Sequence, residues 1–218
     1  MALALFDLDN TLLHGDSDHA WGQFLVDQRI VDRALYEEKN HTFYLQYQRG
    51  DLDIDAYLRF ALAPLAAHPK EMLHAWRQTF MDSVIEPMLL TKGIATVNDH
   101  HNRGDTVVMI TATNRFIAEP IAKRLNINHL LATEVEVVDG QYTGRSINVP
   151  CFQHGKISHL NTWLQTHGHD LTDSTFYSDS QNDLPLLEAV TTPIVVDADP
   201  VLADHARAHG WQAISFRE

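Results

Sequence analysis

With 218 residues, of which 44% are apolar, the chain can bury one core and a modest second domain, and this composition excludes a disordered protein. The formal net charge of -13 argues against a partner bound through the phosphate backbone of DNA or RNA, because such proteins carry clustered positive charge. The chain has a single cysteine, which excludes an intramolecular disulfide bond, and no apolar run near the ~18 residues of a membrane span, so we expect a cytoplasmic protein without a membrane partner.

The first predicted element is a short strand over residues 2–6, an apolar run with the sequence ALALF. Asp7 and Asp9 follow it directly, and Thr11 comes two residues later. Because side chains alternate along extended backbone, we expect both carboxylates to face the same side. Two like charges held side by side disfavour ionisation, so the pair indicates chemistry rather than a simple turn.

Residues 16–85 contain no convincing strand and instead carry amphipathic stretches with helical spacing. These stretches cover residues 19–30, 33–50, 54–68 and 70–84. Gly50 and the pair His68-Pro69 interrupt the pattern in the way that helix ends do. We therefore expect a separate small helical domain over residues 16–85, inserted into a core domain that is formed by residues 1–15 and 86–218.

The rest of the chain alternates short apolar strands with helices. The predicted strands cover residues 105–111, 174–179 and 192–197, and the predicted helices cover residues 115–125, 156–167 and 184–189. A period-two segment around Asp139-Gly140 predicts a β-hairpin. The alternation predicts an α/β fold of the Rossmann-like type, with a parallel sheet between two layers of helices.

The histidines show no spacing typical of a metal site, because neither an HExxH nor a CxxC pattern is present. We therefore expect no zinc site. The sequence Asp99-His100-His101 is interpreted as an exposed helix end.

Polar residues follow the predicted strands at the edge where a parallel sheet binds its ligands. They are Asp7 and Asp9 after the first strand, Thr111 after the second, and Asp179 and Asp183 after the third. Carboxylates, water and a substrate phosphate are the usual ligands of Mg²⁺, and a carboxylate can also attack phosphorus. Thr111 is expected beside a helix start, which is a favourable phosphate site, and Lys156 supplies positive charge. The sequence therefore predicts phosphoryl transfer with Mg²⁺ as cofactor.

Four segments resemble the four motifs of the haloacid dehalogenase superfamily. They are DLDNT from Asp7 to Thr11, MITAT around Thr111, Lys156, and SDSQND with Asp179 and Asp183. The helical insert resembles the C1 cap of this superfamily. The chain as a whole is similar to its subfamily IB, the phosphoserine phosphatase-like hydrolases, over nearly its full length.

The resemblance implies a role for each catalytic residue. Asp7 would be the nucleophile that forms an aspartyl-phosphate, and Asp9 the general acid and base. Thr111 and Lys156 would hold the phosphoryl group. Because dehalogenases of the superfamily lack the second aspartate of the first motif, Asp9 favours a phosphatase or a phosphomutase.

The resemblance also implies a Mg²⁺ site. Its ligands would be the Asp7 carboxylate, the Asp9 main-chain carbonyl and the Asp179 carboxylate, and Asp183 would support them from the outer shell. The substrate is expected to be a small phosphorylated metabolite. The sequence makes no prediction of the oligomeric state.

Three positions bear on the substrate: Asp16, Ala112 and Asn182 match places where these relatives bind it. Asp16 replaces a glutamate that reads the substrate amine. The arginine that pairs with the carboxylate of phosphoserine falls at Ala61, and Arg59 lies on another helical face. A substrate with an amine but no carboxylate is therefore expected, and it would fit Asp16 or Asp18. Histidinol phosphate, from histidine biosynthesis, has that character.

Three alternatives remain open at this point. The first is a phosphoserine phosphatase. The second is a phosphotransferase or phosphomutase, which would use the same aspartyl-phosphate but pass it to another acceptor. The third is a binding protein without catalysis, although such a protein has no need of a nucleophile beside an acid.

Overall fold

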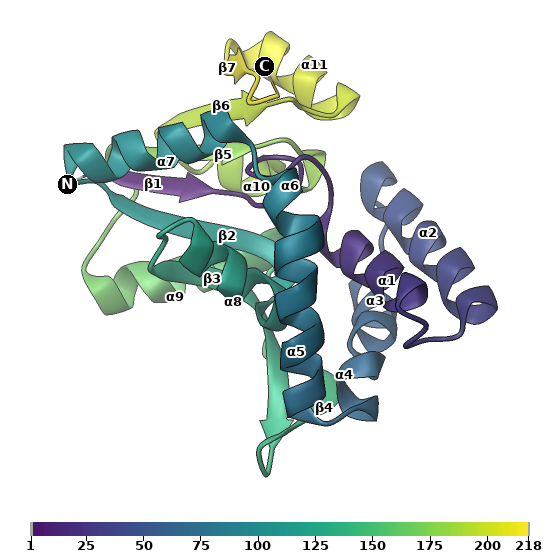
Figure 1. Cartoon of the computed structure of the whole chain (residues 1–218). Helices are drawn as coiled ribbons and strands as arrows, with labels where there is room; N and C mark the ends of the chain where they lie inside the picture. Colours follow the sequence, from purple (N-terminus) through teal and green to yellow (C-terminus); the bar gives the residue numbers. More distant parts are fainter. Residues whose placement is uncertain (1, 218) are drawn as a thin grey trace.

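The computed structural model describes residues 2–217, and these residues form a seven-stranded sheet with helices on both faces (Figure 1). The strands are β1 (Leu3–Phe6), β2 (Thr106–Asn114), β3 (His129–Val138), β4 (Gln141–Ile147), β5 (Ser174–Ser178), β6 (Thr192–Val196) and β7 (Gln212–Ile214). Their order is β4-β3-β2-β1-β5-β6-β7. All neighbours are parallel except β3 and β4. The predicted α/β class is confirmed.

The central strand β1 is buried along its whole length, because helices cover both faces of the sheet. On one face lie α7 (Thr91–Arg103) and α8 (Arg115–Arg124), whose apolar side chains pack with Ala4 and Phe6. On the other face lie α9 (His154–His167), α10 (Leu184–Leu187) and α11 (Pro200–His209), which pack with Leu3 and Leu5. A short 3-10 turn, η2 (Gln181–Asp183), precedes α10.

The segment between β1 and α7 is helical, as its amphipathic stretches predict. Its helices are α1 (Ser17–Asp27), α2 (Arg33–Arg49), α3 (Ile54–Ala61), α4 (Ala63–Ala67) and α5 (Lys70–Phe80), followed by a π-helical turn η1 (Met81–Ile85) and α6 (Glu86–Met88). Gly50 ends α2 with a φ of 76°, as expected of a glycine at a helix end. The third predicted helix divides at Leu62, and Pro64 stands in the first turn of α4. From α5 the chain returns to the core in one continuous run (Figure 1).

The predicted hairpin is confirmed, with Asp139 (φ 50°) and Gly140 (φ 80°) at its turn. The structure adds two features. The first half of β3 pairs in parallel with β2, so that β3 also belongs to the main sheet. In addition, β4 packs against α3 and α4, so the hairpin and the helical segment are in direct contact (Figure 1).

The interpretation of Asp99-His100-His101 as an exposed helix end is wrong for His100, which is 5% exposed. Its Nδ1 lies 2.8 Å from Asp105 Oδ2 and its Nε2 lies 2.9 Å from the Tyr177 hydroxyl. The reason is that this turn of α7 packs on the sheet and not in solvent. Within the described range, no helix combines the length and apolarity that crossing a bilayer requires.

Candidate active site

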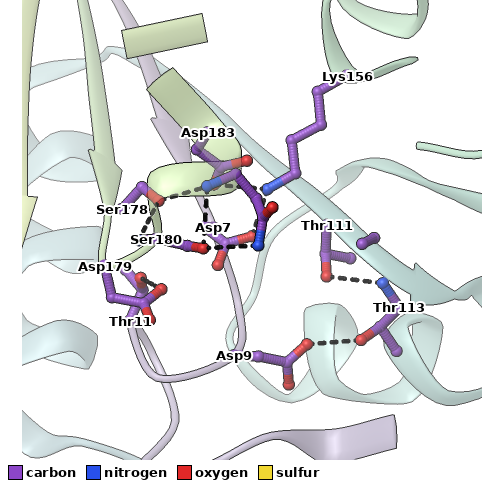
Figure 2. Close-up of polar contacts among 12 residues, drawn as sticks. Asp7, Asp9, Thr11, Thr111, Thr113, Lys156, Ser178, Asp179, Ser180 and Asp183 are labelled. Carbon is purple, nitrogen blue, oxygen red and sulfur yellow. Dashed lines mark hydrogen bonds and ion pairs between the residues drawn. The ribbon is translucent and has the colours of Figure 1, made fainter. Parts of the chain in front are cut away.

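The carboxyl ends of β1, β2 and β5 bring the predicted catalytic residues together (Figure 2). Because β1 lies between β2 and β5, residues that follow β1 lie close to residues from both neighbours. Asp7 comes one residue after β1, and its N–H still donates to the Tyr177 carbonyl at 3.0 Å. Asp179 comes one residue after β5, and Thr111 lies in β2.

Lys156, in the first turn of α9, joins two of the acids. Its Nζ donates to Asp7 Oδ1 and to Asp183 Oδ2, each at 2.7 Å, and all three side chains are at most 3% exposed. The Ser178 hydroxyl also donates to Asp183 Oδ2 at 2.7 Å. Burial lowers the pKa of Lys156, but the charges of Asp183 and Asp7 outweigh it and hold the pKa above its usual range. The lysine is therefore charged at neutral pH.

Asp7 is a carboxylate with one oxygen fixed and one oxygen free. Oδ1 accepts from Lys156, whereas Oδ2 is buried and has no hydrogen-bond partner within residues 2–217. Burial raises the pKa of Asp7 to about 7, the charge of Lys156 opposes this, and the charges of Asp183 and Asp9 add to it. A buried oxygen without a partner is costly, and this cost indicates that a ligand belongs there.

The residues present fit a magnesium ion. The free Oδ2 of Asp7 is a hard oxygen donor, and Asp179, whose Oδ1 accepts from the Thr11 hydroxyl at 3.1 Å, is another. Burial, followed by the charges of Asp7 and Asp183, raises the pKa of Asp179 well above its usual range, which a cation would reverse. Among the described residues, no three His, Cys, Asp or Glu side chains are placed to bind one metal together. The implied set needs only two carboxylates and one main-chain carbonyl.

Asp9 is held by two hydrogen bonds. The Ser17 N–H donates to Oδ1 and the Thr113 hydroxyl donates to Oδ2, both at 2.6 Å. Burial and the charge of Asp16 raise the pKa of Asp9 to about 7, against the effect of these bonds. Sequence reasoning missed Ser17 and Thr113. The position of Thr113 two residues after Thr111, on the same face of an extended strand, is the signal that points to it.

Thr111 does not stand at a helix start, so that expectation is wrong. β2 continues to Asn114, where its pairing with β3 shifts in register, and the Asn114 side chain caps α8 by accepting from the Ile117 N–H. Thr111 is fully buried and its hydroxyl accepts from the Thr113 N–H at 3.1 Å. Both Thr111 and Ala112 line the pocket described next.

A pocket of about 530 Å³, including the part open to solvent, joins the acids to the helical segment. Asp7, Asp9, Asp16 and Asp18 line it together with aromatic residues of α2 and α3. The aromatic residues are Phe43, Tyr44, Tyr47 and Tyr57. Within residues 2–217 no lysine or arginine lines this pocket, and Arg59 is exposed on a separate surface groove.

Asp16 is both a pocket residue and the cap of α1. Its side chain accepts from the His19 N–H at 2.7 Å, which fixes the carboxylate at the start of the helix. Burial raises the pKa of Asp16 to about 6, which the hydrogen bonds from the His19 and Asp18 main chain oppose. The structure places Asp16 in the same pocket as Asp7 and Asp9, and its role in substrate binding stays a prediction.

Asn182 lies outside the set of residues that line the pocket. Its Nδ2 donates to the Tyr47 carbonyl at 3.1 Å, and its Oδ1 accepts from Gln153 Nε2 at 3.1 Å. The neighbouring Gln181 donates to the Gln48 carbonyl at 3.0 Å. The side chain of Asn182 thus ties the core to the end of α2, and it touches the pocket through the main chain of Tyr47, which lines it.

Residues 4–188 match the family model described as haloacid dehalogenase-like hydrolase. The chain belongs to this family. The family predicted from the four sequence motifs is therefore confirmed. The chain is 43% identical to a histidinol-phosphatase of Neisseria meningitidis over 99% of both proteins. It is 33% identical to the phosphoserine phosphatase SerB1 of Mycobacterium tuberculosis over 99% of this chain and 71% of that protein.

Two solved structures place this haloacid dehalogenase-like hydrolase among its structural relatives. A protein of unknown function from Bordetella pertussis is 44% identical, with a TM-score of 0.92, over 99% of this chain and 98% of that one. A substrate-bound phosphoserine phosphatase is 20% identical, with a TM-score of 0.73, over 100% of this chain and 93% of that one. The second likeness shows a shared fold alone.

Proposed function

We propose that the chain is a Mg²⁺-dependent phosphomonoesterase that acts on a small phosphorylated metabolite through an aspartyl-phosphate on Asp7. The observation that carries the proposal is the state of the Asp7 carboxylate. Lys156 fixes one of its oxygens, and the other is buried without a partner among the described residues, in a residue that lines the pocket. A carboxylate that is held in place through one oxygen and has its other oxygen unbonded is suited to attack phosphorus.

The residues around Asp7 supply the other parts of the reaction. An oxygen of Asp7 attacks phosphorus, and the bond from phosphorus to the alcohol oxygen breaks. Asp9, whose pKa is raised to about 7, gives its proton to the departing oxygen and then takes a proton from the water that hydrolyses the aspartyl-phosphate. Thr111, which lines the pocket, holds a phosphoryl oxygen, and Lys156, which is bound to Asp7 Oδ1 behind the pocket lining, supplies positive charge next to the phosphoryl group.

Three groups would hold the metal: the carboxylates of Asp7 and Asp179 and the main-chain carbonyl of Asp9. When bound, Mg²⁺ neutralises charge on the phosphoryl oxygens. Asp183 is engaged by Lys156 and Ser178, which fits a supporting position outside the ligand set.

We further propose that the substrate alcohol is positively charged and that histidinol phosphate is the substrate. Asp16 and Asp18 line the pocket, and no lysine or arginine within residues 2–217 does so. Histidinol phosphate carries an ammonium group and an imidazole ring, which suit such a pocket. The carboxylate of phosphoserine would meet the like charges of Asp16 and Asp18, which are half-buried. The similarity to the histidinol-phosphatase of Neisseria meningitidis supports this choice.

The experiment is a steady-state assay of the purified protein with Mg²⁺, following release of free phosphate. We expect kcat/KM for histidinol phosphate to exceed that for phosphoserine by at least about 100-fold, because like charges brought together at a site cost several kcal/mol. Comparable turnover of the two esters would contradict the proposed substrate and favour a phosphoserine phosphatase.

Two controls separate the remaining alternatives. Release of phosphate without an added acceptor argues against a phosphotransferase or a phosphomutase. The variant Asp7→Asn should have no measurable turnover, since its amide is a poor nucleophile. Full activity in this variant would show that the nucleophile is misassigned, and binding without turnover in the wild type would identify a non-catalytic binding protein.

A further inference from the structure

The pocket contains a second acid, Asp18, that the reaction at phosphorus does not use. Asp18 lies in the first turn of α1, and its Oδ1 accepts from Asn114 Nδ2 at 2.8 Å. Asn114 in turn caps α8 through its own Oδ1. A core residue with a fixed side chain therefore holds the Asp18 carboxylate in one orientation, so little conformational entropy is lost when it binds a ligand.

Asp18 lines the same pocket as Asp7 and Asp16. Burial, followed by the charges of Asp16 and Asp9, raises the pKa of Asp18 well above its usual range, and a hydrogen bond from Tyr57 opposes this. A ligand whose phosphoryl group lies at Asp7 therefore has two further carboxylates, Asp16 and Asp18, within its pocket.

The wall beside Asp18 is aromatic. Phe43 and Tyr57 line the pocket and pack edge to face, with ring centroids 5.5 Å apart. An aromatic face next to a carboxylate suits a flat, nitrogen-containing ring, which stacks on one group and donates an N–H to the other. The buried Oδ2 of Asp7, which has no partner within residues 2–217, independently indicates that the same pocket holds a ligand.

We propose that Asp18 determines specificity by binding a second nitrogen-bearing group of the substrate, an imidazole ring, while Asp16 binds the ammonium group. This inference rests on the proposed phosphatase function, which supplies the phosphoryl end of the substrate. The role of Asp18 requires a second nitrogen-bearing group in the substrate, which binding of the ammonium group by Asp16 alone does not require. A phosphorylated amino alcohol without a ring leaves the half-buried Asp18 carboxylate without a charged partner, so it binds less well.

The test compares Asp18→Asn with the wild type on two esters, histidinol phosphate and ethanolamine phosphate. Asparagine keeps an oxygen that can accept from Asn114, so the change removes charge and preserves the fixed position. We expect kcat/KM for histidinol phosphate to fall about 10-fold to 100-fold more than kcat/KM for ethanolamine phosphate, mainly through KM, because a hydrogen bond to a charged group is lost. Equal losses on both esters would overturn the inference and show a structural role.

A matched control is Asp55→Asn, which removes an exposed acid from the first turn of the neighbouring helix α3. It should leave the ratio of the two kcat/KM values unchanged. If Asp18→Asn folds poorly in thermal unfolding, Asp18→Ser serves as the second variant, and the same ratio is read.

Calorimetry with the products histidinol and ethanolamine requires no turnover and separates this inference from the proposed function. A loss of histidinol affinity in Asp18→Asn that is at least about 10-fold larger than the loss of ethanolamine affinity supports the role of Asp18. If Asp18→Asn loses histidinol affinity selectively but the wild-type protein hydrolyses neither ester, only the phosphatase proposal fails. Equal losses of affinity contradict the role of Asp18 even in an active enzyme.

Discussion

Lys156 shows how one residue serves both the stability and the chemistry of the site. Its ammonium group lies between two carboxylates, Asp7 and Asp183, at 2.7 Å from each, and all three groups are almost fully buried. A buried ion pair adds little net stability when it is complete, since desolvation offsets the attraction. Removing one partner is costly, because the remaining charge stays buried without compensation.

The variant Lys156→Met is therefore expected to lose about 3–5 kcal/mol of unfolding free energy, measured by urea denaturation in EDTA. Adding Asp183→Asn should restore part of this stability without restoring activity. The control Lys123→Met removes a lysine whose side chain is 72% exposed and pairs with Glu119, and it should cost less than about 1 kcal/mol. Similar losses for the two single variants would contradict the role given to Lys156.

The sequence predicts the position of Asp7, Asp9, Asp179 and Lys156, because each lies at a strand end or in the first turn of a helix. It does not predict what holds Asp9. The chain after Asp9 folds back, with Asn10 at a φ of 55° and its N–H donating to the Gly15 carbonyl, and this brings the Ser17 N–H onto the carboxylate. Periodicity carries no information on such a loop.

At the scale of elements, the hairpin of β3 and β4 packs against the helical segment through β4, which contacts α3 and α4. Gly144 in β4 has a φ of 77°, and a Cβ atom there would lie 3.0 Å from Ala66 Cβ and 3.3 Å from the Leu62 carbonyl oxygen. The close approach of β4 to α4 thus depends on the absence of a side chain. The pair Asp139-Gly140 predicts the hairpin turn, but no local pattern predicts the long-range contact that Gly144 permits.

Two glycines of this hairpin make a matched pair of tests. Gly144 and Gly140 both have positive φ values, 77° and 80°, but a Cβ at Gly140 would meet nothing within 4 Å. Gly140→Ala should cost about 1 kcal/mol for the backbone conformation alone. Gly144→Ala should cost more, by about 1–3 kcal/mol, because the added methyl group must displace α4. Equal urea midpoints for Gly140→Ala and Gly144→Ala would show that the packing of β4 against α4 does not require a glycine at position 144.

At the scale of the whole molecule, folding gathers negative charge that the extended chain keeps apart. Asp7 lies 172 residues before Asp179 in the sequence, yet β1 and β5 are paired neighbours in the sheet. Burial and the charges of neighbouring acids raise the pKa of both carboxyl groups. The strand ends and the order of motifs predict this meeting. The parallel half of β3, the terminal strand β7 and the burial of His100 depend on contacts across the sheet and are not predicted.

A bound Mg²⁺ ion should therefore stabilise the folded chain as a whole. Free Mg²⁺ at about 100 times its dissociation constant contributes about 2.7 kcal/mol. A change of this size raises Tm by about 5–10 °C in a chain of this length. The measurement is thermal unfolding in EDTA and then in excess Mg²⁺ at constant ionic strength.

Whether the rise in Tm comes from Mg²⁺ at the proposed site is tested at Asp179, which would supply one of the two carboxylate ligands. Asp179→Asn should abolish most of the Mg²⁺-dependent rise in Tm and should itself be as stable as the wild type in EDTA, or more so, because it removes a buried charge next to Asp7. The control Asp204→Asn removes an exposed acid that pairs with Arg207 and should keep the full shift. A shift that persists in Asp179→Asn would mean that Mg²⁺ stabilises the chain elsewhere, through its general negative charge.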